Sequence, residues 1–149
     1  ELTAVVKEAY EEYVGQATKK SQQISLEMPD EKLNIQADGA QIREAAANLI
    51  GNAIKYTPEN GTVRVVVRQD NGHAVFEVID TGFGIPAEQQ ASLFQPFFRA
   101  SSDETANIEG TGLGLHLVKN IIKRYDGEMI FNSEYGKGST FGFKMTVIK

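Results

Sequence analysis

The sequence predicts an α+β fold with two layers: a mixed, mainly antiparallel sheet with helices on one face. Stretches whose apolar residues recur at helical spacing alternate with short runs rich in Val, Ile and Phe. The dipeptide Asn71-Gly72 between two such runs is a strong hairpin signal. The 149 residues suffice for one domain with a sizeable core, so we expect residues 1–149 to form a single domain.

The first third of the chain predicts two helices separated by extended segments. Apolar residues of 2–17 recur with a helical period, which predicts an amphipathic helix. Residues 22–29 and 32–38 are strand candidates on either side of a charged turn. Asp38 is a suitable N-cap for a helix over 39–56, which a proline shortly afterwards ends.

The remaining elements follow from turn residues and periodicity. Strands over 61–69 and 73–80 flank the Asn-Gly turn. The polar stretch Arg99–Gly110 has no periodic apolar pattern and predicts a mobile loop. The other predicted elements are a short helix at 86–93, a helix at 112–125, and strands at 127–133 and 139–148.

Composition narrows the classes of function. The formal net charge of −5 argues against a nucleic-acid-binding protein, which usually has a basic face. The chain has no cysteine and only two histidines, which argues against a structural zinc site. No apolar run approaches the length of a membrane span, and no signal peptide opens the chain, so we expect no direct membrane contact. The first residue is Glu rather than Met, which indicates a fragment of a longer protein.

The predicted helix over 39–56 carries an unusual polar edge, in the stretch "NLIGNAIKYT". At about 100° per residue, Asn48, Asn52 and Lys55 fall within roughly one sixth of the circumference, with Tyr56 at its border. A solvated face is one explanation. The alternative is a ligand site, because an Asn oxygen suits Mg²⁺, Lys suits a phosphate and Tyr offers a face to a purine.

Two glycine clusters favour the ligand site. "DTGFGIPA" begins at Asp80 and fits the loose dinucleotide pattern G-x-G-x-x-A, but its strand is the second arm of a hairpin, so a tight turn at Gly82 and Gly84 is an equal alternative. "GTGLGL", Gly110–Leu115, places three alternating glycines at the start of a helix. Such a helix start offers unpaired N–H groups to an anion.

Together these motifs resemble the ATP-binding catalytic domain of bacterial sensor histidine kinases. The family's motifs occur in order over nearly the whole length: the N box "NLIGNAIKYT", the first glycine box "DTGFGI", the F box "FQPFF", the second glycine box "GTGLGL" and a late "GKGSTF". The resemblance implies a Bergerat fold that binds ATP with Mg²⁺ and donates the γ-phosphoryl group to a histidine. It also implies a cytoplasmic location, whether or not the parent protein is anchored to a membrane.

The resemblance assigns roles to individual residues. Asn52 matches the magnesium ligand, and Asn48 the asparagine one turn earlier. Lys55 matches a phosphate-contacting lysine, Tyr56 the aromatic residue beside adenine, and Asp80 the acceptor for the adenine amino group. The other matching positions are Gly82, Gly84 and Ile85 in the first glycine box, Arg99 for the terminal phosphates, Gly110, Thr111, Gly112, Leu113, Gly114 and Leu115 in the second glycine box, and Ser139 near the adenine end.

Two features qualify the resemblance. Gyrase- and chaperone-type ATPases of this superfold have a glutamate at the position of Asn48, so hydrolysis here lacks its general base. Neither His73 nor His116 lies in the family's acceptor context. The resemblance therefore places the acceptor on a dimerisation domain of the same parent protein, in cis or in trans, with a response regulator downstream. The alternatives are a related ATPase, an anti-sigma-type serine kinase, or a degenerate nucleotide-binding regulator.

Overall fold

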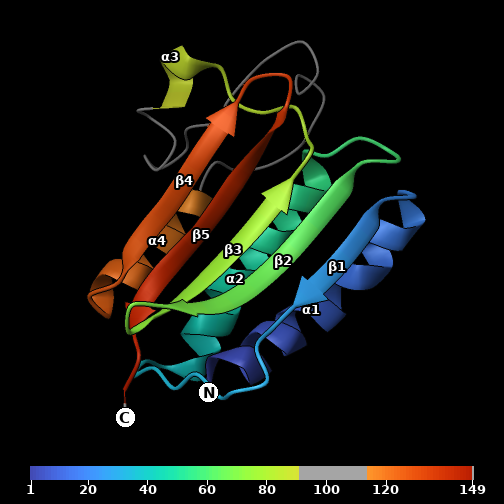
Figure 1. Ribbon diagram of the computed structural model, residues 1–149. Helices are drawn as coiled ribbons and strands as arrows, with labels where there is room; N and C mark the ends of the chain where they lie inside the picture. The colour runs from blue at the N-terminus through green and yellow to red at the C-terminus, as the bar shows by residue number, and fades with distance from the viewer. Residues whose placement is uncertain (91–113, 149) are drawn as a thin grey trace.

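The computed structural model describes residues 1–90 and 114–148, and within them five strands form one sheet in the order β1-β2-β3-β5-β4 (Figure 1). β1 is parallel to β2, and the other three neighbouring pairs are antiparallel. The predicted mixed, mainly antiparallel sheet is therefore confirmed. The strands are β1 (Gln23–Glu27), β2 (Thr62–Asp70), β3 (His73–Asp80), β4 (Glu128–Glu134) and β5 (Gly138–Thr146).

Three helices cover one face of this sheet: α1 (Leu2–Lys19), α2 (Gly39–Lys55) and α4 (Gly114–Arg124) (Figure 1). The short α3 (Ala87–Gln90) lies beyond the end of the sheet toward which β3 points. The core fills the space between the layers, where the rings of Phe76 and Phe143 pack with centroids 5.0 Å apart. The predicted helices on one face are confirmed.

The helix α2, which lies at the centre of this layer, forms for the reasons visible in the sequence. The Asp38 side chain accepts hydrogen bonds from the backbone N–H groups of Ala40 (2.8 Å) and Gln41 (3.3 Å), so it caps the helix as expected. One stripe of the helix faces the core and leaves the polar edge on another side. The buried stripe consists of Ile42, Ala45, Ala46, Leu49, Ile50, Ala53 and Ile54.

The β2–β3 hairpin brings the end of β3 to the middle of the sheet. Asn71 (φ 49°) and Gly72 (φ 79°) both adopt positive φ, as a type I′ turn requires. The register that follows pairs Asp80 with Val63 of β2 on one side and with Ser139 of β5 on the other. The chain then leaves the sheet into the first glycine box.

One predicted strand is wrong. Residues 32–38 have strand-like alternation but form no strand, because other parts of the chain take their backbone groups. The Leu33 carbonyl accepts a hydrogen bond from the first residue of α1, Leu2 (2.8 Å), and the Asn34 carbonyl accepts one from Ile148 (2.8 Å). Buried Leu33 accounts for the apolar pattern. Within residues 1–90 and 114–148, no helix is long and apolar enough to cross a membrane.

Candidate functional site

Asp80 is a buried carboxylate at the end of β3, and only 9% of its surface is exposed. Its Oδ1 accepts hydrogen bonds from the backbone N–H groups of Gly82 (2.9 Å) and Ser139 (3.2 Å). Burial raises the pKa of Asp80 to about 6, although these two hydrogen bonds act to lower it. At neutral pH the side chain is therefore an ionised acceptor at considerable desolvation cost, and this combination is typical of functional sites.

The first glycine box packs directly on the end of α2. A Cβ on Gly82 would overlap the Tyr56 carbonyl oxygen and would lie 2.9 Å from Asp80 Oδ1 and 3.0 Å from Thr57 Oγ1. The Phe83 N–H also donates to the Tyr56 carbonyl (3.2 Å). Glycine at position 82 is therefore required by close approach rather than by unusual backbone angles. The loop holds Asp80 and Tyr56 side by side.

At Gly84 the backbone angle matters as well, because its φ is +70° and a Cβ would overlap the carbonyl of Glu134. The next residue, Ile85, is buried and donates its N–H to Ser133 Oγ (2.9 Å). That hydroxyl lies 2.7 Å from the hydroxyl of Ser139. The wall around Asp80 thus includes Ser133, which sequence reasoning missed. The sequence feature that could have indicated Ser133 is its pairing with Ser139, since both hydroxyl residues occupy helix-facing positions of β4 and β5.

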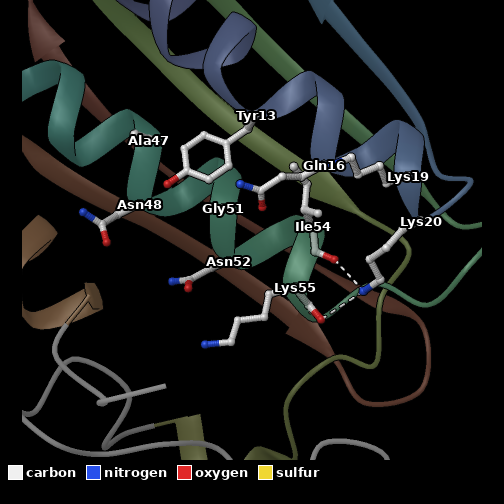
Figure 2. A pocket seen from close by; sticks show the side chains of 10 residues that line it. All are labelled: Tyr13, Gln16, Lys19, Lys20, Ala47, Asn48, Gly51, Asn52, Ile54 and Lys55. Carbon is white, nitrogen blue, oxygen red and sulfur yellow. Dashed lines mark hydrogen bonds between the residues drawn. The ribbon is translucent and has the colours of Figure 1, made fainter. Parts of the chain in front are cut away.

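The predicted polar edge of α2 is confirmed. Figure 2 shows Asn48, Asn52 and Lys55 extending from the same side of the helix, where they line a groove of about 610 Å³ between α1 and α2. Asn48 donates from Nδ2 to the Glu44 carbonyl (2.9 Å). The Lys55 ammonium lies 5.7 Å from the ring centroid of Tyr56, within the range of a cation–π contact.

The start of α4 lies beside this edge. A Cβ on Gly114 would be 3.1 Å from Asn48 Oδ1 and 3.8 Å from Asn52 Nδ2. The next residue, Leu115, packs against the core and holds the first turn of α4 in place. The N-terminal N–H groups of an eleven-residue helix therefore begin next to the two asparagines.

The structure thus brings together the predicted site residues that it describes, in two adjoining groups. One group forms a wall at the end of β3 and the start of β5, and it consists of Asp80, Gly82, Gly84, Ile85 and Ser139. The other group is the polar side formed by the α2 edge and Gly114. Tyr56, at the end of α2, lies between the two groups. Arg99, Gly110, Thr111, Gly112 and Leu113 lie outside the described residues, as does the rest of the Arg99–Gly110 loop, so their places remain predictions.

The sheet order and this site define a nucleotide-binding domain of the Bergerat type. The family model for histidine kinase-, DNA gyrase B- and HSP90-like ATPases matches residues 37–148. The chain belongs to this family. Helix α1 and strand β1 precede the matched segment, yet they pack against α2 and pair with β2.

Similar proteins within this family are sensor kinases. The adaptive-response sensory kinase SasA of Crocosphaera subtropica is 37% identical over 149 residues, which cover 99% of this chain and 38% of SasA. The chain therefore spans well under half of that relative.

Solved structures also share the fold, among them two of the histidine kinase ThkA. The catalytic domain of ThkA gives a TM-score of 0.84 at 27% identity, covering 98% of this chain and 94% of that domain. ThkA in complex with the response regulator TrrA gives 0.80 at 26% identity, covering 99% of this chain and 41% of ThkA. Full-length ShkA in complex with AMPPNP gives 0.83 at 26% identity, with coverages of 99% and 31%. The resemblance seen in the motifs is confirmed.

Proposed function

We propose that this chain is the catalytic domain of a sensor kinase, binding Mg²⁺–ATP and donating the γ-phosphoryl group to a histidine on a separate dimerisation domain. The observation that carries the proposal is the buried, backbone-held Asp80, on the wall that packs against the end of the helix whose polar edge carries Asn52 and Lys55. Family membership and the nucleotide analogue bound by ShkA support it.

Asp80 is suited to select adenine. An ionised carboxylate accepts a hydrogen bond from the exocyclic amino group of adenine, whereas the carbonyl that guanine has at that position is itself an acceptor. The Asp80 pKa of about 6 keeps the group mostly ionised at neutral pH. Tyr56, at the end of α2 beside this wall, supplies a ring for the purine to contact, and the N–H of Ser139 holds Asp80 from the neighbouring strand β5.

The α2 edge is suited to the triphosphate. Mg²⁺ prefers oxygen ligands and usually takes one or two from protein, with phosphates and water completing the shell. Asn52 offers one such oxygen, and the described residues contain no group of three His, Cys, Asp or Glu side chains able to hold a metal alone. When bound, the ion neutralises phosphate charge. Lys55 and the N–H groups at the start of α4 add positive potential, and Arg99 joins them in this proposal.

The residues favour transfer over hydrolysis. Asn48 is neutral and its amide donates to the Glu44 carbonyl, so it offers no general base for water. His73 begins β3 and Asp80 ends it, which separates them by about 23 Å at roughly 3.3 Å per residue. His116 bonds to Asn120 on its own helix (3.1 Å). The acceptor therefore belongs on another domain, with a response regulator receiving the phosphoryl group next, as the solved ThkA–TrrA complex suggests.

Titration of the protein with ATP and with GTP tests the adenine assignment. Replacing Asp80 by Asn should weaken ATP binding about 10- to 150-fold, because a hydrogen bond to a charged group contributes about 1.5–3 kcal/mol. GTP binding should be weak in both proteins. The exposed Asp30→Asn serves as a matched control for loss of a carboxylate. Unchanged ATP affinity in a folded Asp80→Asn variant would remove Asp80 from the site.

A further inference from the structure

The segment that follows α1 reaches across to the end of α2. Lys20 donates from Nζ to the carbonyls of Ile54 (3.0 Å), Lys55 (3.3 Å) and Thr57 (2.8 Å). Gln22 donates from Nε2 to two of the same carbonyls, those of Ile54 (2.9 Å) and Thr57 (2.6 Å). Figure 2 shows the Lys20 side chain directed at the last turn of α2. We name Lys20 and Gln22 the α1–α2 clamp.

The backbone conformation at the end of α1 directs the side chains of Lys20 and Gln22 toward α2. Ser21 adopts φ 57°, the left-handed conformation that commonly ends helices. Its N–H donates to Thr18 (3.0 Å), and the N–H of Gln22 donates to Ala17 (3.0 Å). These two bonds form a Schellman motif, with a serine in the place usually taken by glycine. The reversal at Ser21 leaves Lys20 and Gln22 on either side of it, both facing α2.

The carbonyls that the clamp holds have few other partners available. The last carbonyls of a helix lack intrahelical partners and carry the partial negative charge of the helix dipole, so an ammonium group is well placed there. Thr57 is fully buried and Gln22 is 6% exposed, so water has little access to these bonds. The Tyr56 carbonyl, between them, is taken by Phe83 of the first glycine box.

Lys20 is therefore occupied as a structural donor rather than poised as a phosphate ligand. A lysine has three N–H donors, and here three carbonyl oxygens lie within hydrogen-bonding distance of Nζ. Its neighbour Lys19 lines the same groove and is exposed, but donates to none of these carbonyls.

We propose that the α1–α2 clamp positions the nucleotide site: Lys20 and Gln22 fix the last turn of α2, and thereby Lys55 and Tyr56, in the geometry that binds ATP. The inference rests on the proposed function, because it acts through the residues assigned there to phosphate and adenine. The clamp lies in a segment that precedes the matched family region and is remote in sequence from every motif of the site. It makes the segment that follows α1 a positioning element of the nucleotide site.

The test measures Mg²⁺–ATP affinity by calorimetry for six proteins, with folding checked by thermal unfolding. The wild-type chain is compared with Lys20→Met, Lys19→Met, Lys20→Arg, Lys55→Met and the double variant Lys20→Met/Lys55→Met. Lys20→Met should weaken binding about tenfold, a size usual for residues coupled through direct contact. Lys19→Met, which removes the same charge from the same groove, should change affinity less than about twofold. Lys20→Arg, which keeps several donors, should recover most of the affinity.

The double variant separates positioning from a general structural effect. If Lys20 acts through Lys55, much of the effect of Lys20→Met should disappear once Lys55 is already Met. Full additivity would overturn the proposal, as would equal weakening by Lys19→Met or wild-type affinity in Lys20→Met. Should Lys20→Met not fold, Gln22→Leu decides, with weakened binding expected and unchanged binding contradicting the clamp. A wild-type chain that binds no ATP would overturn the proposed function instead.

Discussion

Asp80 should make this protein less stable above pH 6 than it would be with a neutral side chain. The relevant perturbation is Asp80→Asn, which removes the charge and keeps an oxygen able to accept from the N–H groups of Gly82 and Ser139. Burial raises the pKa of Asp80 from 3.8 to about 6 in the folded protein. Between these values the folded state holds a proton that the unfolded state has lost.

The sign and size follow from that difference. Because the pKa of Asp80 is higher in the folded state than in the unfolded state, protonation of Asp80 favours folding. This contribution to stability is complete below about pH 4 and is lost as the pH rises through 6. Two pKa units at about 1.4 kcal/mol each give a destabilisation of about 3 kcal/mol at pH 8, and about half of that at pH 5. Asp80→Asn should raise the free energy of unfolding by these amounts.

Urea unfolding at pH 5 and pH 8 measures the effect in the absence of nucleotide. The exposed Asp30→Asn is the control, because its charge change should alter stability by less than about 0.5 kcal/mol at both pH values. An Asp80→Asn protein no more stable than wild type at pH 8, or equally stabilised at both pH values, would refute the assignment of Asp80 as a desolvated carboxylate. Together with weakened ATP binding, the predicted result would show stability given up for function.

Two further substitutions test the local backbone. Gly84→Ala should destabilise the protein by at least about 2 kcal/mol, because φ is +70° and the new Cβ would overlap the Glu134 carbonyl; a urea midpoint equal to wild type would contradict this. Ser21→Gly should stabilise it by about 0.5–1 kcal/mol, because glycine adopts the left-handed conformation with less strain and the exposed Ser21 is not a clamp residue; a lowered melting temperature would count against the Schellman motif.

Features that depend on local signals could be predicted from the sequence. The Asp38 cap and the Asn71-Gly72 turn act over a few residues, so their letters identify them. The strand predicted at 32–38 failed because alternation reports burial and not a partner. Leu33 is buried, but its carbonyl pairs with the start of α1 rather than with a strand.

The residues of the site and of the clamp likewise differ in whether the sequence predicts them. Asn52, Lys55 and Asp80 lie in recognisable motifs, and the structure places them in one region, with Asn52 and Lys55 on the edge of α2 and Asp80 on the wall that packs against its end. Lys20 and Gln22 could not be found from the sequence, because their bonds span 32 to 37 residues and their carbonyl partners do not depend on residue type. No local sequence pattern indicates whether Lys19 or Lys20 will reach the end of α2.

Transfer of the labelled γ-phosphoryl group from ATP tests the central claim most directly. The isolated chain would be incubated with γ-labelled ATP and Mg²⁺, alone and with the proposed acceptor, a histidine-bearing dimerisation domain, added in trans. We predict no label on the chain itself, little released phosphate, and acid-labile label on the added domain, because in the proposed function this chain holds the triphosphate and the acceptor histidine lies on the other domain. Acid-labile label on the isolated chain, or rapid phosphate release without the partner, would contradict the account.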